Sequence, residues 1–170
     1  AVLVASLAMS AYLAFRFEWR QAIGILLSVV HDAIVALGLL SLFQIEFDLN
    51  IIAGLMAVIG YSLNDSIVIS DRLRDLLSSR TQMGIHECSD VAIKATFSRT
   101  MITSGTTLFT VGALLLFGGD ALYGFSFTLF AGILVGTVSS ITVASTVQEL
   151  LGLTPQAYQK KSEEPLANAA

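Results

Sequence analysis

Asp65 and Arg99 are the two residues best placed to do chemistry, because each is an ionisable side chain inside an apolar segment. An uncharged run over 49–59 leads to Asp65, and the next charged residues are Asp71 and Arg72, where the segment returns to water. Keeping a carboxylate ionised inside a membrane costs roughly 2.5 to 3.5 kcal/mol on insertion scales, so such a group is a functional candidate. Asn64, directly beside Asp65, is a possible supporting residue.

Arg99 is the natural partner for this acid. It lies about 9 Å into its own apolar segment, and Asp65 lies about 10 Å before the end of its segment at Arg72. If the two helices are neighbours, the carboxylate and the guanidinium sit at nearly equal depth. An acid and a guanidinium at one depth are candidate partners.

Three threonines follow Arg99 on the same helical face, at i+4, i+8 and i+11: Thr103, Thr107 and Thr110. A line of hydroxyls above a charged group can order a file of water molecules. The alternative is that each threonine bonds the carbonyl four residues earlier in its own helix, while Arg99 extends its side chain to the membrane surface. Both interpretations are open from the sequence.

His31 and Asp32 form a second polar pair near the middle of an apolar segment, where neither residue type is expected without a role. Because they are consecutive, they point about 100° apart in a helix and cannot both face one partner. Hydrogen bonding between helices and proton transfer are both open. His86 is the only other histidine, so the ligands for a metal-dependent hydrolase are missing and we expect no metal site.

The composition indicates a membrane domain. The 170 residues are 55% hydrophobic and 13% charged, with a mean hydropathy of +0.78. The single cysteine, Cys88, allows no internal disulfide and is expected in a polar loop. No strand pattern competes with the apolar runs, so we expect an all-α bundle.

Five membrane helices are expected, followed by a cytoplasmic tail at 148–170. The first would be only about 22 Å long against a hydrocarbon core of about 30 Å, so we expect it to continue upstream of Ala1. A polar loop at 73–92 separates the third and fourth helices, and a short helix within it is expected to feed the fourth. The expected helices cover about 1–15, 21–43, 49–72, 93–117 and 122–147.

The basic residues predict the orientation. All nine lie after the first helix, around the long loop, or in the tail: Arg16, Arg20, Arg72, Arg74, Arg80, Lys94, Arg99, Lys160 and Lys161. The turns at the opposite side hold Glu46, Asp48 and Asp120 and no basic residue. The positive-inside rule therefore predicts a cytoplasmic long loop and C-terminus.

Small residues predict where helices pack closely. Gly132 and Gly136 form a GxxxG pattern, which Ser139 and Ser140 extend. Small residues also recur in the third helix, at Ala53, Ala57 and Gly60. The charged end of that helix, from Asp71 to Asp75, is a solvated terminus or, alternatively, a cytoplasmic gate or partner contact.

The run NDSIVISDRLRD at 64–75 resembles the signature of the SecF family of protein-export membrane proteins. Four other stretches agree in order and type: His31-Asp32, FDLNIIAGLMAVIGYS at 47–62, SRTMITSGTTLFT at 98–110 and GFSFTLFAGILVGTVSS at 124–140. The resemblance extends to about residue 147. It implies helices two to six of a six-helix half of the resistance-nodulation-cell-division (RND) fold, without the family's first helix and periplasmic domain.

This resemblance implies a function. Such proteins pair with SecD, often with YajC, and use the proton-motive force to help draw a preprotein across the inner membrane after SecYEG and SecA have begun translocation. Asp65 matches the family's intramembrane acid and Arg99 its essential arginine, so the resemblance implies that Asp65 and Arg99 form a proton relay. The implied proton path also needs an acid from SecD, so this chain alone would not complete it. No cofactor is implied.

Two rival functions share the fold. A proton-coupled RND transporter of lipids or drugs would use the same acid, although a SecF-type signature is not expected there. A structural membrane subunit would need the packing residues but no proton relay. We expect no enzymatic activity, and an intramembrane aspartyl protease is disfavoured because Asp65 follows YSLN where such an enzyme has GxG.

Overall fold

Four long helices make up the described part of the protein. The structure is a computed structural model that describes Tyr12 and residues 17–79 and 83–151, and no strand occurs among them. The helices are α2 (Trp19–Leu42), α3 (Leu49–Ser79), α4 (Ile85–Phe117) and α5 (Asp120–Leu150). Apart from Tyr12, the helix expected at 1–15 lies outside the described residues, as does the tail after Leu151.

All four helices are long and apolar enough to cross a membrane. They contain 24 to 33 residues, which gives lengths of about 36 to 50 Å against a hydrocarbon core of about 30 Å. The predicted all-α membrane bundle is confirmed, and the chain is a multi-pass membrane protein. Since α3, α4 and α5 are each about 45 Å or longer, they extend beyond the hydrocarbon on at least one side.

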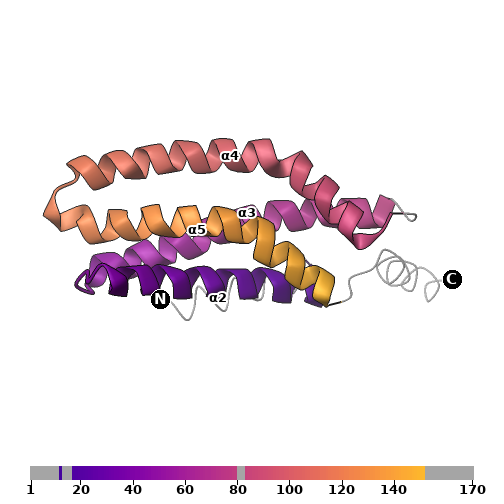
Figure 1. Ribbon diagram of the computed structural model, residues 1–170, viewed down its shortest axis with the longest axis horizontal. Coiled ribbons are helices and arrows are strands. Elements are labelled where there is room, and N and C mark those ends of the chain that lie inside the picture. Colours follow the sequence, from indigo (N-terminus) through magenta and orange to yellow (C-terminus); the bar gives the residue numbers. More distant parts are fainter. Residues whose placement is uncertain (1–11, 13–16, 80–82, 152–170) are drawn as a thin grey trace.

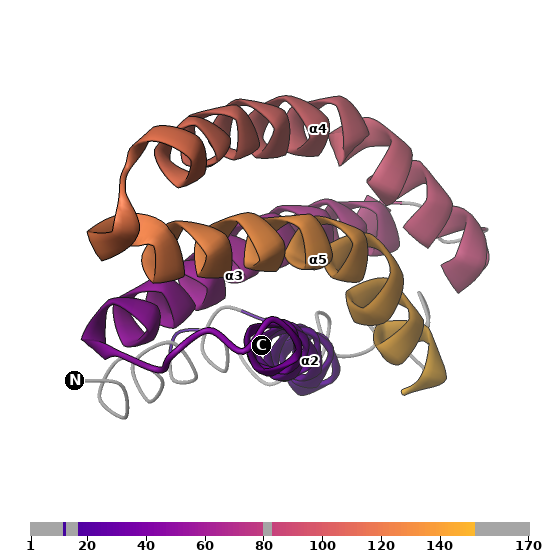
Figure 2. The ribbon, with the colours of Figure 1, turned by 60° about the vertical axis from the view of Figure 1, so that its left-hand side comes forward.

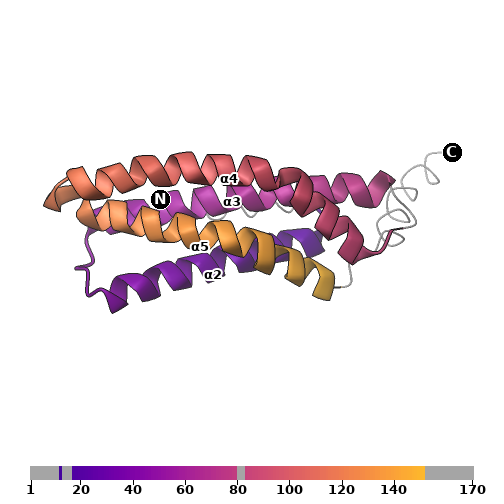
Figure 3. The same cartoon turned by 45° about the horizontal axis from the view of Figure 1, so that its top comes forward.

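α5 is the central helix. It packs against α2, α3 and α4, while α2 and α4 lie on opposite sides of the bundle (Figures 1 and 3). Figure 2 shows α4 arching over α5 and α3, and α4 is the least buried of the four helices. Large apolar side chains such as Ile102, Phe109 and Leu116 are exposed along it.

The turns at one end of the bundle are short and tied together. Asp48 accepts a hydrogen bond from the Ile51 backbone N–H at 2.8 Å, which caps the start of α3. Asn50 donates to Asp48 and to the Ala121 carbonyl, which connects the α2–α3 turn to the start of α5. Gly119 reverses the chain between α4 and α5 with a φ of 71°, a conformation that favours glycine.

The stretch predicted as a loop at 73–92 is largely helical, because α3 continues to Ser79 and α4 begins at Ile85, so the short helix expected to feed the fourth helix is the first part of α4. Both helices run on past the expected membrane surface and pack against each other through Leu73, Leu77 and Cys88, which are all fully or almost fully buried. Cys88 is therefore a core residue of this hairpin, not a loop residue. The charges at Asp71 and Arg72 marked the water boundary, but a helix does not have to end where it leaves the membrane.

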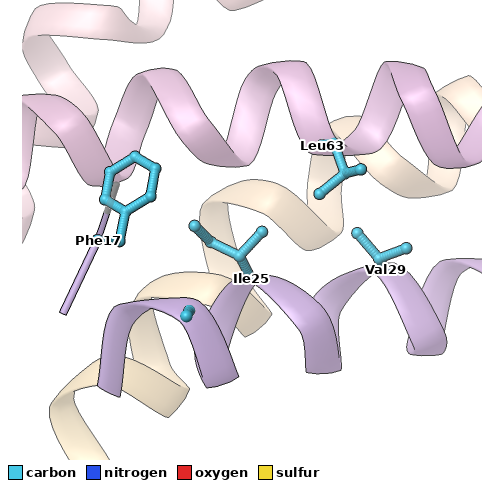
Figure 4. Close-up of a cluster of buried hydrophobic side chains, with 5 residues drawn as sticks. Phe17, Ile25, Val29 and Leu63 are labelled. Carbon is cyan, nitrogen blue, oxygen red and sulfur yellow. The ribbon is translucent and has the colours of Figure 1, made fainter. Parts of the chain in front are cut away.

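The other helix ends differ from the prediction by smaller amounts. α2 begins two residues earlier than expected, at Trp19, and α5 covers Asp120–Leu150 instead of about 122–147. Figure 4 shows a buried cluster between α2 and α3, with Phe17 and Ile25 at one end and Val29 and Leu63 at the other. Burial of this aromatic side chain fixes the approach to α2.

Glycines bring α3 and α5 into close contact. A Cβ placed on Gly132 would lie only 3.0 Å from Val58 Cβ and closer still to the Val58 methyl groups. A Cβ on Gly54 would meet Thr128 at 3.1 Å, one helical turn away. These parallel helices therefore touch nearly backbone to backbone, and Gly132 lies at the closest point.

The small residues of α3 that were predicted to pack do not do so within the described chain. Gly60 has no atom within 4 Å of an added Cβ, and Ala53, Ala57 and Gly60 are all exposed. The face of α3 that contacts α5 instead carries Gly54 and Val58. Small size alone did not reveal which side of the helix meets a neighbour.

We predict that Gly132→Ala destabilises the protein by about 1 to 3 kcal/mol, because the new methyl group overpacks against Val58. Thermal unfolding of the purified protein in mild detergent measures the change. Gly60→Ala is the matched control and should keep or raise stability, because its site is open and alanine favours a helix. Adding Val58→Ala to Gly132→Ala should recover part of the loss. Equal melting temperatures for the two glycine variants would contradict the contact.

Candidate functional site

Asp65 is buried inside the bundle, with 4% of its surface exposed. It lies on the side of α3 that faces α4, with Ser104 and Arg99 of α4 near its carboxyl group. One carboxylate oxygen, Oδ2, has no hydrogen-bond partner among the described residues. The acid that the sequence singled out is thus removed from water and only partly satisfied by its own chain.

Arg99 lies close to Asp65 but on the exposed side of α4. It lines a pocket of about 330 Å³ with Thr96, Asp71 and Asp75, at the charged end of α3. Tyr61 and Ser104 are in contact across these antiparallel helices, and this register places Asp65 opposite Thr100, next to Arg99. The two groups therefore lie at similar depth, although no ion pair joins them in the described chain.

Ser104 connects three helices at this site, and no pattern in the sequence singled it out. Tyr61 of α3 donates to its hydroxyl at 3.3 Å, and Thr137 Oγ1 of α5 lies 2.9 Å from the same oxygen. Ser104 is 3% exposed and lies near Asp65. A buried serine in an otherwise exposed helix is a usable signal, but only once the buried side of α4 is known.

The threonines after Arg99 bond their own helix. Thr103, Thr107 and Thr110 donate to the carbonyls four residues earlier at 2.8 to 3.0 Å. Thr110 is exposed and the other two are only half-buried. Of the two interpretations left open by the sequence, the structure supports carbonyl bonding, so the expected file of water along this face has no support in the described residues.

His31 and Asp32 join α2 to two different helices. Asp32 is 1% exposed and accepts a short hydrogen bond from Ser62 of α3. His31 Nδ1 lies 3.1 Å from Asp32 Oδ1 and 3.3 Å from Ser139 Oγ of α5. The two side chains thus have different helices as partners, as their angular separation predicted, and of the two roles left open the contacts fit interhelical hydrogen bonding.

The remaining sequence candidates are separated by the fold. Asn64 is exposed, on a different side of α3 from the buried Asp65. Gly136 packs at the α2–α3–α5 junction, where an added Cβ would lie 3.4 Å from Asp32 Oδ2 and 3.5 Å from Ser62 Cβ. The structure therefore brings Asp65 near Arg99, and places His31 and Asp32 in another cluster with Gly136.

The chain matches a family profile described as "Protein export membrane protein SecD/SecF, C-terminal" over residues 1–153. Among curated proteins, it is 50% identical to the protein translocase subunit SecF of Escherichia coli O157:H7 and 47% identical to that of Vibrio alginolyticus. These matches cover 90% of this chain but 47% and 49% of the relatives. The chain thus spans about half the length of the curated relatives it matches.

Solved structures show the same likeness. A crystal structure of SecDF in a "super-membrane-facing form" gives a TM-score of 0.81 at 38% identity over 99% of this chain and 22% of that one. A crystal structure of SecDF from Thermus thermophilus, described as a translocon-associated membrane protein, gives a TM-score of 0.82 at 42% identity over 86% of this chain and 20% of that one. Fold and sequence therefore agree on one family.

We predict that Ser62→Ala lowers the free energy of unfolding by about 1 to 3 kcal/mol, because the buried Asp32 carboxylate loses its hydroxyl donor from α3. Chemical or thermal unfolding in detergent measures the loss. Ser126→Ala is the matched control, since Ser126 is equally buried but bonds only the Leu122 carbonyl of its own helix. If the two variants lose equal stability, the Asp32–Ser62 bond does not hold the helices together.

Proposed function

Because the chain belongs to the SecD/SecF family of protein-export membrane proteins, we propose that it is the membrane part of a SecF subunit that uses the proton-motive force to promote preprotein translocation. The proposed site of energy coupling is Asp65 with Arg99. The observation that carries this proposal is the burial of the Asp65 carboxylate in a membrane helix beside a guanidinium. Burial in a low-dielectric interior and a nearby cation act on the carboxylate in opposite directions, so a small rearrangement changes its preference for a proton.

The energy available suits this task. One elementary charge that crosses a potential of 100 mV gains about 2.3 kcal/mol, which is enough to bias a helix arrangement with two states of similar energy. In the proposed cycle, Asp65 binds a proton from water and releases it as Arg99 moves closer. The change in their attraction is conveyed through α3 and α4 to the remainder of the translocation machinery.

The proposed partner in the membrane is SecD. Arg99 is exposed on α4, the least buried helix, so this site is open on the side where another subunit could supply a further acid. The name SecDF on both related structures supports a pairing of this kind. YajC, SecYEG, SecA and preproteins are proposed as further partners on the family relationship alone.

We also propose that the α3–α4 hairpin and the C-terminus face the cytoplasm of a bacterial inner membrane. Support comes from the distribution of charge, since Arg72, Arg74 and Lys94 lie at the hairpin end of the bundle. The turns at the other end carry Glu46, Asp48 and Asp120. Positive charge on the cytoplasmic side is the general rule for short loops.

We predict that Asp65→Asn and Arg99→Met, each in the complete protein, abolish the proton-driven part of preprotein translocation, because the first removes the proton-binding group and the second its cation. Translocation into inverted membrane vesicles, with and without an uncoupler, measures this part. We expect at least a tenfold loss of the uncoupler-sensitive rate, with normal amounts of the variant in the membrane.

Asp90→Asn and Lys94→Met are the matched controls, since both residues are exposed on the outer part of α4 and neutralising them leaves the buried site intact. They should translocate as the unaltered protein does. If Asp65→Asn and Arg99→Met keep an uncoupler-sensitive rate equal to these controls, the chain has a structural role in export without proton coupling. Substrate efflux that requires Asp65 but no preprotein would instead favour a transporter.

We predict that a single cysteine at Ser78, an exposed residue at the end of α3, reacts with a membrane-impermeant thiol reagent in inverted vesicles and not in intact spheroplasts. A cysteine at Glu46 in the opposite turn should show the reverse pattern. Cys88 is replaced by alanine in both cases. Reaction of the Ser78 cysteine from outside the cell would reverse the proposed orientation.

A further inference from the structure

A ladder of serines runs along the side of α3 that faces α2 and α5. Ser62, Ser66 and Ser70 are spaced one helical turn apart, and each is no more than 1% exposed. They face α2 and α5, not α4. Three hydroxyls in line at the centre of an apolar membrane bundle need partners that the hydrocarbon cannot supply.

The ladder ends in polar side chains at both ends. At one end, Ser62 donates to Asp32, with Gly136 in close contact. At the other end, Gln148 Nε2 of α5 donates to Ser70 Oγ at 2.8 Å, and Gln21 Nε2 of α2 donates to the Ser70 carbonyl at 3.3 Å. Both glutamines are buried, at 0% and 1% exposure.

At the level of Ser66, the middle serine of the ladder, all three helices carry polar side chains. In the α3–α5 contacts, each α5 residue follows its α3 neighbour by 74 positions, as in Gly54 with Thr128 and Val58 with Gly132. The same offset places Ser140 beside Ser66. Ser28 lies one helical turn before Asp32 on α2. Because α2 and α3 are antiparallel and Asp32 bonds Ser62, Ser28 lies at the level of Ser66, one turn after Ser62. Ser28 and Ser140 are fully buried.

The hydrogen bonds along this ladder are incomplete. Ser66 Oγ, Gln21 Oε1 and Gln148 Oε1 have no partner among the described residues, although each atom is buried. A buried polar atom left without a partner costs about 1 to 3 kcal/mol. Ser66 also differs from Ser126 and Ser140, which satisfy their hydroxyls with carbonyls of their own helix.

We propose that the core shared by α2, α3 and α5 binds a column of water molecules along Ser62, Ser66 and Ser70, between Asp32 and the glutamines. Water bound at Ser66 has the Ser28 and Ser140 hydroxyl oxygens at the same level as acceptors, although Ser28 also bonds Ser139 and Ser140 donates to the Thr137 carbonyl. Water beside Ser70 has the two unpaired glutamine oxygens. Each water thus has two or more polar partners, which a buried water needs.

This column goes beyond the proposed function, because it includes neither Asp65 nor Arg99. It makes Asp32 a second intramembrane acid in contact with bound water. Asp32 thus contacts the side of α3 that faces α2 and α5, while Asp65 lies on the side that faces α4. Hydrogen bonding between helices does not by itself account for these residues. Interhelical hydrogen bonds would pair the polar groups, whereas Ser66 Oγ, Gln21 Oε1 and Gln148 Oε1 are unpaired in the described chain.

The test is the reactivity of a cysteine placed in the ladder. Ser66→Cys is compared with Ile69→Cys, a nearby α3 position that is 3% exposed and apolar, both in the complete protein with Cys88→Ala, in native membrane vesicles. The probe is methyl methanethiosulfonate, which is small and neutral and reacts with the thiolate, a form that a dry apolar site suppresses. Mass spectrometry of the extracted protein gives each reaction rate.

We expect Ser66→Cys to react at least about tenfold faster than Ile69→Cys, because water beside it permits ionisation of the thiol. A smaller ratio overturns the column. If Ser66→Cys does not accumulate in the membrane, the melting temperature of Ser66→Ala decides: removing a hydrated hydroxyl lowers it, while removing a dry, unpaired hydroxyl raises it and overturns the proposal. Loss of the column leaves the result for Asp65→Asn translocation unchanged, so the two proposals fail separately.

Discussion

The protein is shaped by one constraint: a polar group inside the hydrocarbon must find its partner within the protein. The threonines of α4 meet it with carbonyls of their own helix, which leaves them free to face outward. Asp32 meets it by reaching across to Ser62 on α3. Asp65 meets it only in part, since one of its oxygens lacks a partner in the described chain. Polar side chains in this bundle thus fall into three groups: those that bond a carbonyl of their own helix, those that bond another helix, and those with an atom left unpaired.

The membrane helices were predictable because each contains a long apolar run. Their ends were less predictable, since charge reports where water begins and not where hydrogen bonding along the backbone stops. Leu73, Leu77 and Cys88 form a small core beyond that boundary, and only their packing across two helices shows that the chain there is helical. The regular spacing of leucines in this polar stretch could have indicated an amphipathic helix, but the surrounding charges favoured a loop.

The depth of Asp65 and Arg99 in the membrane was predictable from the sequence, but the side of its helix on which each residue lies was not. Counting residues from each helix end placed Asp65 and Arg99 at one level, and the register of α3 and α4 agrees. Counting could not tell that Asp65 points inward while Arg99 is exposed, because facing depends on the rotation of each helix in the bundle. The same limit explains why Ala57 and Gly60 were chosen for packing when Gly54 and Val58 make the contact, and why Ser66 and Gln148 were missed. Each face is set by neighbours that are distant in sequence.

Ser104 has a consequence for how α4 can move. Between its buried start at Cys88 and the middle of the membrane, α4 also buries Ala92, Thr96 and Thr100, and the Ser104 hydroxyl accepts hydrogen bonds from Tyr61 of α3 and Thr137 of α5. Two such hydrogen bonds contribute a net of about 1 to 3 kcal/mol, the same range as the work done by a single charge falling through the membrane potential. In the proposed cycle, breaking and remaking these two hydrogen bonds would therefore cost no more than the passage of a single charge supplies.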